Sequence, residues 1–371
     1  MTDRETALRA EHERLGARMT SFAGWRMPLH YGSQLGEHRA VRENAGLFDL
    51  SHMGTVWVSG PEAGAFLDYA VVGGISGMEV GQAKYTLLCT PEGGIVDDLI
   101  VYRVGEDRFL TVPNAANTAA VIGELVERSA GFTTEITDST SATALLAVQG
   151  PRAVEIVGAL ATEPVEDIGY YRARWTTLGG LHVLLARTGY TGEDGFEVFL
   201  PGKHASGLWH ELVATAPDLV PAGLAARDSL RLEAAMPLYG NELSRDVDPF
   251  TVGLGGIVGL KRKTADFVGR EALERIRAAH LAREPGRRVL VGLVGDGRRA
   301  ARQGDAVLLD GQEVGRVTSG LPSPTLGRPI ALAIVDPAAA EVGTAVEADV
   351  RGRREPFTVV ERPFYRRPET H

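Results

Sequence analysis

The segment from Gly93 to Tyr102 constrains the fold most, because it places two carboxylates inside a stretch that otherwise has the composition of a buried strand. Gly93-Gly94 is a turn signal, and Ile95 to Tyr102 is rich in the β-branched and aromatic residues that are typical of strands. Successive side chains of a strand point to opposite faces. Asp97 and Asp98 are therefore predicted to lie on different sides.

Both faces of this predicted strand are otherwise apolar, which indicates that it is covered on both sides. Asp97 shares its face with Leu99, and Asp98 shares its face with Ile100. A buried carboxylate is costly unless it finds hydrogen-bond donors or raises its pKa. We therefore expect at least one of the two to face a pocket. The alternative is that both carboxylates cap the Gly93-Gly94 turn.

Composition excludes several classes of protein. The chain has 371 residues, of which 44% are hydrophobic, and this size predicts roughly two or three domains. A net charge of -9 argues against a nucleic-acid binder. No apolar run approaches the ~20 residues of a membrane span, and residues 1–18 lack the apolar core of a signal peptide. Cys89, the only cysteine, excludes an internal disulfide and a cysteine-cluster metal site. We expect a cytoplasmic protein that binds neither nucleic acid nor membrane.

Helical and strand patterns alternate irregularly over the first two thirds of the chain. Helices are predicted at 4–18, 34–45, 114–129 and 223–235, and strands at 55–58, in three runs between 83 and 113, at 143–148, and in a hairpin of 181–187 with 196–200. The three consecutive strand runs suggest an antiparallel meander. Antiparallel strands mixed with helices predict an α+β fold and not a doubly wound sheet.

The composition changes after residue 280. Residues 282–288 are charged and contain Pro and Gly, as a linker does. Short, evenly spaced strands are predicted beyond them, at 289–294, 306–309, 313–318, 330–335, 345–350 and 356–360. This pattern predicts a small β-barrel of about 85 residues.

Two further stretches carry polar residues in unusual settings. Residues 187–197 contain three glycines, which allow a backbone to approach a ligand closely, and Glu197 follows where the strand resumes. The alternative is a solvated hairpin. Residues 223–233 form a small-residue helix with Arg227 and Arg231 four positions apart on one face. The alternative there is a surface network of ion pairs.

Two shorter motifs complete the set. His52, within Ser51-His52-Met53-Gly54, stands alone before a strand and is predicted to be a structural histidine whose hydrogen bonds are satisfied. Pro363-Phe364-Tyr365-Arg366 places aromatic rings beside a cation near the end of the sequence, where tails are usually disordered unless docked.

Taken together, in this order and at these spacings, the motifs resemble one family closely, the aminomethyltransferase of the glycine cleavage system, or T-protein. The matching motifs are Phe22-Ala23-Gly24-Trp25, residues 48–54, residues 93–98, Asn114-Ala115, Gln149-Gly150-Pro151, residues 187–197, residues 223–233, Leu238-Tyr239-Gly240, residues 267–273, Thr318-Ser319-Gly320, residues 323–327 and Pro363-Phe364-Tyr365. The resemblance covers nearly the whole chain.

The resemblance implies a fold and a reaction. It implies a folate-binding catalytic region of two intertwined α+β subdomains over residues 1–280, and a small β-barrel over residues 286–371, arranged around a central channel. The family transfers the methylene carbon of an aminomethyl group, carried on the lipoyl arm of H-protein, to tetrahydrofolate. The products are 5,10-methylenetetrahydrofolate, ammonia and the dihydrolipoyl arm. The implied partners are lipoylated H-protein and the co-substrate tetrahydrofolate, and no metal is implied.

The resemblance also assigns roles to individual residues. Asp98 matches the catalytic carboxylate, which leaves Asp97 a structural role on the opposite face. The residues that match folate-binding positions are Glu197, Arg227, Asn114, Tyr85, Tyr190, Met53 and Arg366. Pro113 departs from the family pattern, since an aliphatic residue is more usual there, and it removes a backbone donor from the predicted strand.

Two alternatives stay open on the sequence alone. One is a related folate-dependent demethylase or one-carbon transferase, although no dinucleotide-binding fingerprint accompanies the folate motifs. The other is a non-enzymatic folate-binding factor for iron–sulfur assembly. That relative carries a Lys-Gly-Cys-Tyr loop and lacks the acidic pair, whereas this chain has Arg187-Thr188-Gly189-Tyr190 and retains Asp98.

Overall fold

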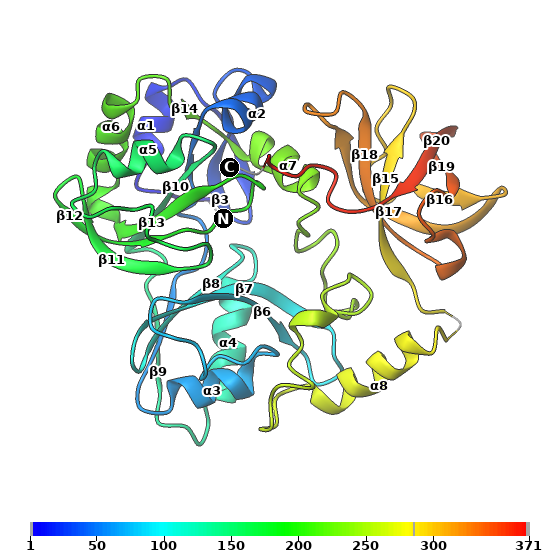
Figure 1. Ribbon diagram of the computed structural model, residues 1–371, viewed down its shortest axis with the longest axis horizontal. Helices are drawn as coiled ribbons and strands as arrows, with labels where there is room; N and C mark the ends of the chain where they lie inside the picture. The colour runs from blue at the N-terminus through cyan, green and yellow to red at the C-terminus, as the bar shows by residue number, and fades with distance from the viewer. Residues whose placement is uncertain (1–2, 285, 369–371) are drawn as a thin grey trace. The chain divides into compact units, whose positions relative to one another are not determined.

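The computed structural model describes residues 3–284 and 286–368, which divide into two compact units (Figure 1). Unit 1 has the bounds Met1–Ala70, Gly74–Thr86 and Leu99–Asp228. Unit 2 has the bounds Val71–Gly73, Leu87–Asp98 and Ser229–His371. The chain therefore passes between the units several times. Among the described residues, no helix is long and apolar enough to cross a membrane.

A six-stranded sheet with helices on one face forms the larger core of unit 1. Its strand order is β11-β12-β13-β10-β4-β14. The strands are β4 (Gly46–Asp49), β10 (Thr143–Gln149), β11 (Ala173–Leu178), β12 (Leu181–Ala186), β13 (Gly195–Pro201) and β14 (Val220–Pro221), and the helices around them include α2 (Gln34–Glu43), α5 (Ala153–Gly158) and α6 (Ala205–Thr215). Apolar side chains of α5 and α6 pack in one cluster with alternate residues of the strands, such as Val148 and Val198. The residues between them point to the opposite face of the sheet.

The N-terminal segment differs from the single helix predicted for residues 4–18. It forms β1 (Arg4–Glu5), the short helix α1 (Arg9–Arg14) and β2 (Arg18–Phe22), and with β3 (Trp25–His30) the strands make a sheet in the order β1-β3-β2. Gly16 has a φ of +70°, a conformation that ends the helix and that glycine adopts without strain. Strand pairing at both ends thus overrides the local helical pattern.

The predicted meander is present in a five-stranded sheet of order β6-β7-β8-β5-β9. Its strands are β5 (Val56–Ser59), β6 (Ala83–Cys89), β7 (Ile95–Gly105), β8 (Arg108–Pro113) and β9 (Glu135–Asp138), accompanied by α3 (Ala63–Ala70) and α4 (Thr118–Arg128). The helix predicted to start at Asn114 begins four residues later. Residues 114–117 instead form a turn in which the Asn117 N–H donates to the Asn114 carbonyl at 3.0 Å.

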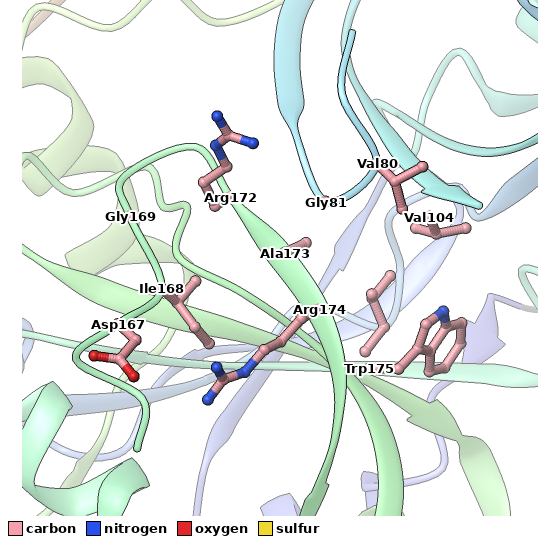
Figure 2. A pocket seen from close by; sticks show the side chains of 11 residues that line it. Val80, Gly81, Val104, Asp167, Ile168, Gly169, Arg172, Ala173, Arg174 and Trp175 are labelled. Atoms are coloured by element: carbon pink, nitrogen blue, oxygen red, sulfur yellow. The ribbon is translucent and has the colours of Figure 1, made fainter. Parts of the chain in front are cut away.

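A short segment around Gly81 joins the six-stranded sheet to the part of the five-stranded sheet that lies in unit 1 (Figure 2). The Gly81 N–H donates to the Arg103 carbonyl on β7, and the Gly81 carbonyl accepts from the Ala173 N–H on β11, both at 2.7 Å. Beside this seam lies a cavity of about 570 Å³, whose lining includes Arg174 and Trp175. None of the predicted site residues is among the described residues that line it.

The C-terminal part of unit 2 is a closed barrel of order β15-β18-β17-β16-β19-β20, as the strand spacing predicted. Its strands are β15 (Val289–Gly295), β16 (Ala306–Leu309), β17 (Gln312–Pro322), β18 (Pro329–Val335), β19 (Ala345–Val350) and β20 (Arg353–Val360), and α8 (Arg270–Leu281) precedes it. Its core is apolar and includes Leu293, Ala333 and Phe357. Mixed sheets with helices and a separate barrel confirm the α+β prediction.

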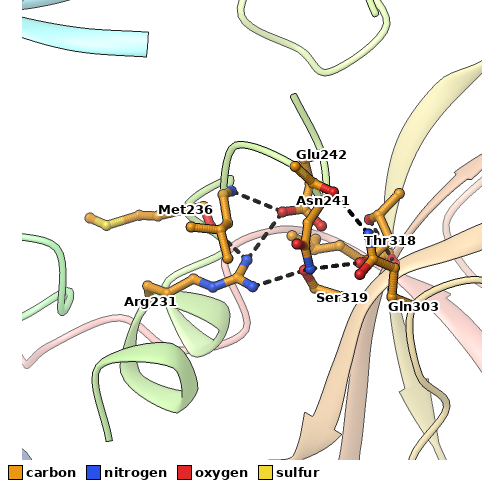
Figure 3. Close-up of polar contacts among 10 residues, drawn as sticks. Arg231, Met236, Asn241, Glu242, Gln303, Thr318 and Ser319 are labelled. Carbon is orange, nitrogen blue, oxygen red and sulfur yellow. Dashed lines mark hydrogen bonds and ion pairs between the residues drawn. The ribbon is translucent and has the colours of Figure 1, made fainter. Parts of the chain in front are cut away.

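A buried ion pair lies in unit 2 at the end of α7 (Leu224–Glu233) (Figure 3). The Arg231 guanidinium lies 3.1 Å from Glu242 Oε2 and donates to Ser319 Oγ on β17 at 2.8 Å. The two charged side chains are only 2% and 0% exposed. The alternative of a surface ion-pair network on this helix is therefore wrong for Arg231. Two residues later, the Glu233 carboxylate accepts hydrogen bonds from Ser323 and Thr325.

Candidate functional site

A buried carboxylate in unit 1 is the most distinctive polar group of the α+β region. Glu197 lies on β13 between Ala147 of β10 and Ala186 of β12, on the face that α5 and α6 do not cover. It is 8% exposed. Its Oε2 accepts hydrogen bonds from Thr188 Oγ1 at 2.5 Å and from Tyr102 Oη at 3.1 Å. Among the described residues, Oε1 accepts no hydrogen bond, so this oxygen is available to a further donor.

The phenol of Tyr102 stays neutral beside this carboxylate. Burial raises its pKa well above the ordinary value, and the charge of Glu197 raises it further. The Tyr102 and Thr188 hydroxyls also lie 3.0 Å apart, so three side chains form a closed polar triangle. The hydrogen bonds keep the Glu197 carboxylate in one orientation, with Oε2 against the two hydroxyls.

A cation stacks on an aromatic ring in the same unit. The turn between β12 and β13 carries Tyr190, and the Arg227 guanidinium carbon on α7 lies 4.6 Å from the centre of its ring. Both side chains are partly exposed. This cation–π contact orients the planar guanidinium, a group whose fork of N–H donors suits a carboxylate. The structure thus brings together two of the residues predicted to bind folate.

A glutamine that the sequence did not single out supports the same turn. Gln149, the last residue of β10, is 1% exposed. Its amide nitrogen donates to the Thr188 carbonyl at 3.0 Å, and its amide oxygen accepts from Thr191 Oγ1 at 2.9 Å. The only local signal was the motif Gln149-Gly150-Pro151, which indicates a strand end and not a hydrogen-bonding role.

Met53 and Asn114 belong to two segments that lie side by side in unit 1. The Gly54 N–H donates to the Pro113 carbonyl at 3.0 Å. Pro113 is the last residue of β8 and pairs with Leu99. The proline therefore does not prevent strand pairing, because the end of a strand tolerates the missing donor and its carbonyl is still used. Met53 and Asn114 are both half-buried.

His52 does not meet the prediction of a satisfied structural histidine. Its ring is 1% exposed and its Nδ1 has no hydrogen-bond partner among the described residues. The ring packs edge-on against Phe22, with 5.7 Å between the ring centres. Burial lowers the pKa of His52 to about 4; the positive charge of Arg227 lowers it too, and Asp49 opposes them. At neutral pH this imidazole is uncharged.

The lowered pKa of His52 predicts how stability depends on pH. Between pH 6.5 and about 4 the unfolded chain binds a proton at this ring that the folded chain does not, so stability rises with pH across this window. As the pH falls through this window, protonation of His52 is expected to lower the free energy of unfolding by roughly 3 kcal/mol. Denaturant unfolding at several pH values should show a shallower slope for His52→Phe than for the unmodified chain. The same exchange at the exposed His182 is the control, and equal slopes for His52→Phe and the unmodified chain would contradict this prediction.

The acidic pair lies in unit 2, at the start of β7. Asp97 is fully buried, whereas Asp98 is partly exposed. Ile95 is the first residue of this strand. Its N–H donates to the Ser244 and Val247 carbonyls, with 3.1 Å between nitrogen and oxygen in each case. Both aspartates lie within β7 and not in the turn that precedes it. Of the two, Asp98 is the carboxylate that a ligand can reach.

The charges of this pair shift the pKa of Tyr239, which also lies in unit 2. Its hydroxyl donates to the Ile95 carbonyl at 3.4 Å. The pKa of Tyr239 is raised, by burial first and then by the negative charges of Asp97 and Asp98, while Arg245 acts in the opposite direction. Both carboxylates of the pair therefore act on this part of unit 2. A carboxylate favours positive charge that develops on a molecule bound beside it.

The two remaining predicted residues lie apart from these clusters in the sequence. Tyr85 is half-buried on β6 in unit 1. Arg366 is exposed and follows β20 in unit 2, one residue after Tyr365, whose N–H donates to the Glu233 carbonyl at 2.8 Å. Over residues 3–284 and 286–368, no group of three or more His, Cys, Asp or Glu side chains is placed to hold a metal ion.

Comparison with known proteins identifies the family. A family model described as the GCVT N-terminal domain matches residues 8–262, and one described as the glycine cleavage T-protein C-terminal barrel domain matches residues 288–366. An aminomethyltransferase of Streptomyces coelicolor is 53% identical over 367 residues, which cover 98% of each chain. One of Moorella thermoacetica is 44% identical over 368 residues and 99% of each chain. The crystal structure of glycine cleavage system aminomethyltransferase T from Bartonella henselae matches with a TM-score of 0.91 and 36% identity over 98% of each chain. The chain therefore belongs to the aminomethyltransferase family of the glycine cleavage system, the T-proteins.

Proposed function

We propose that this chain transfers the methylene carbon of an aminomethyl group, carried on the lipoyl arm of H-protein, to tetrahydrofolate. The products are 5,10-methylenetetrahydrofolate, ammonia and dihydrolipoyl H-protein. The observation that carries the proposal is the buried Glu197 carboxylate, whose Oε2 is held by two hydroxyls and whose Oε1 accepts no hydrogen bond from the described residues. A ligand with N–H donors on a planar ring suits this group.

Glu197 recognises the pterin ring in this proposal. The amino and amide edge of a pterin presents N–H donors, which a carboxylate accepts. Because the hydroxyls of Tyr102 and Thr188 already use Oε2, the pterin contact is made chiefly through Oε1. The carboxylate thus makes one strong hydrogen bond to the pterin, and not a bidentate contact.

The stacked pair of Arg227 and Tyr190 binds the p-aminobenzoyl-glutamate part of the co-substrate. The guanidinium pairs with a carboxylate, and the ring offers an aromatic face. Met53, Asn114 and Tyr85 contribute further contacts to folate. Arg366 is included as a cation for the same anionic tail.

Asp98 stabilises the positive charge that develops during transfer and accepts a proton. The reaction must place folate N5 against the carbon of an S–CH2–NH3+ group, and that carbon gains cationic character as ammonia leaves. A partly exposed carboxylate can orient N5, accept its proton and stabilise the cation. Asp97, fully buried, has a structural role.

The protein has two domains and acts in the cytoplasm in this proposal. The catalytic region spans residues 1–280 and the barrel domain spans residues 286–371, tetrahydrofolate is a co-substrate, and no metal takes part. The enzyme acts in the cytoplasm with lipoylated H-protein as its partner.

One assay tests the reaction. Purified chain is mixed with aminomethylated H-protein, and ammonia release is followed with and without tetrahydrofolate. Folate-dependent release at a catalytic rate is the expected result. Release that does not depend on folate would overturn the proposal. Binding of folate without any release would favour the non-enzymatic folate-binding alternative, and transfer from free methylated amines in place of H-protein would favour a demethylase.

Glu197→Gln is expected to weaken tetrahydrofolate binding more than it slows the reaction of bound folate. The amide places an N–H where the carboxylate had an acceptor, which leaves an unsatisfied polar contact that costs about 1–3 kcal/mol. Titration calorimetry measures the affinity, and the rate at saturating folate measures the bound step. Unchanged affinity would remove Glu197 from the binding site.

A further inference from the structure

The side chain of Gln149 occupies a place that two glycines leave open for it. Gln149 pairs with Gly195 across β10 and β13, on the same face of the sheet as Glu197. A Cβ atom at Gly195 would lie 2.5 Å from the amide nitrogen of Gln149, and a Cβ at Gly189 would lie 2.0 Å from its amide oxygen. The backbone thus approaches the amide more closely than any other residue type would allow.

The amide of Gln149 ties together both ends of a four-residue turn. It donates to the carbonyl of Thr188 at the start of the turn and accepts from the hydroxyl of Thr191 at its end. Arg42 adds a second restraint outside the turn, because it donates to the Thr191 carbonyl at 2.7 Å and forms a buried ion pair with Glu193. Among these contacts, only the Gln149 side chain bonds to both ends of the turn.

This turn carries one residue of each cluster described above. Thr188 donates its hydroxyl to Glu197 Oε2 at 2.5 Å, and the ring of Tyr190 lies under the guanidinium of Arg227 at 4.6 Å. Among the described residues, Gln149 makes no hydrogen bond to Glu197 or to Arg227. Its influence on them passes through Thr188 and Tyr190.

We propose that Gln149 is a positioning residue for the folate co-substrate, which sets the orientation of the Glu197 carboxylate and of the Arg227 guanidinium together. This inference rests on the proposed function. Without the amide, the Thr188 carbonyl loses the donor supplied by Gln149 and the Thr191 hydroxyl loses its acceptor, although it keeps the bond that it accepts from the Glu193 N–H, and the turn relaxes to find new partners. The Thr188 hydroxyl then leaves Oε2 and the Tyr190 ring leaves Arg227, so both ends of the folate lose orientation in one step.

The first test uses Gln149→Met, which keeps the length of the side chain and removes its hydrogen bonds. It is expected to raise the Kd and the KM for tetrahydrofolate by about 10- to 100-fold, since each 1.4 kcal/mol corresponds to tenfold. The kcat at saturating folate is expected to stay within about twofold, because Asp98 is not on this turn. Gln303→Met, which removes a single amide hydrogen bond to Gly240, is the matched control and should leave the Kd unchanged.

A pH profile separates positioning from a general loss of stability. In Gln149→Glu the ionised carboxylate cannot donate to the Thr188 carbonyl, whereas the protonated acid can donate to it and still accept from Thr191. Folate affinity of this variant is therefore expected to recover by about tenfold as the pH falls from 8 to 5.5. Glu193, Glu197 and Arg42 also carry charge around the turn, and the unmodified chain measured in parallel accounts for their contribution.

The outcomes are distinguishable. If the unmodified chain does not bind tetrahydrofolate, both the proposed function and this inference are overturned. If it binds and Gln149→Met binds equally well, or if Gln149→Glu shows no recovery at low pH, the inference alone is overturned. Should Gln149→Met fail to fold, Thr191→Val decides, because it removes the hydrogen bond from Thr191 to the Gln149 amide at nearly constant volume, together with the bond that the Thr191 hydroxyl accepts from the Glu193 N–H. A Kd equal to that of the unmodified chain would then refute the positioning role.

Discussion

Replacement of Asp98 by asparagine is expected to reduce the rate of methylene transfer by about 10²- to 10⁴-fold, the usual effect of losing a positioned acid–base or charge-stabilising group. Asparagine has the same shape but carries no charge, so it cannot accept a proton or balance the cation that forms as ammonia leaves. Affinity for tetrahydrofolate should stay close to that of the unmodified chain. Single-turnover ammonia release at saturating folate measures the step, and calorimetry measures the affinity.

Asp97→Asn is the matched control for this experiment. Asp97 is the adjacent residue on the same strand, but it is fully buried while Asp98 is partly exposed. The substitution should affect activity only through the amount of folded protein. A large loss of rate in correctly folded Asp97→Asn, with near-normal rates for Asp98→Asn, would reverse the assignment of the two faces.

Replacement of Arg231 by methionine is expected to lower the free energy of unfolding by about 3–5 kcal/mol, because it removes the ion-pair partner of the buried Glu242 carboxylate and leaves it with the more distant charge of Arg362. Glu242 is 0% exposed, and its Oε1 has no hydrogen-bond partner among the described residues even when the arginine is present. Its Oε2 would retain only the Leu238 N–H, at 2.9 Å. Chemical denaturation of the full chain, followed by circular dichroism, measures the change.

Two further variants show whether the loss comes from burial of the unpaired charge. In Arg231→Met with Glu242→Leu both charges are removed, and much of the stability is expected to return. Arg275→Met removes an arginine that is 68% exposed and pairs with Glu271, a change expected to cost less than about 1 kcal/mol. Similar losses in the free energy of unfolding for Arg231→Met and Arg275→Met would show that the buried ion pair stabilises the fold no more than an exposed one.

The parts of the fold that were predictable are those that local chemistry decides. The β-branched run after Gly93-Gly94 predicted β7, and the short alternating runs after residue 288 predicted all six strands of the barrel. In both regions the hydrophobic pattern and the turn residues indicate the same structure. The segment 4–18 failed because its helical pattern competes with strand pairing at both ends, and the energy of that pairing depends on residues elsewhere in the chain.

The sequence predicted which residues belong to the candidate site, but not which of them contact one another. The motifs drew attention to Glu197, Tyr190 and Arg227, yet no local pattern indicates that Tyr102 donates to Glu197 across 95 positions of sequence. Gln149 was noticed only as part of a motif, and its hydrogen-bonding role could not be predicted, because its hydrogen bonds reach 39 and 42 positions along the chain. The missing partner of His52 could not be foreseen either, since satisfaction of a buried ring depends on everything that packs around it.

The seam at Gly81 has a mechanical consequence for unit 1. Because one residue donates to β7 and accepts from β11, the five-stranded and six-stranded sheets are joined by a continuous path of main-chain hydrogen bonds and not by a slack loop. The two sheets therefore cannot slide past each other at this point without breaking the two main-chain hydrogen bonds of Gly81.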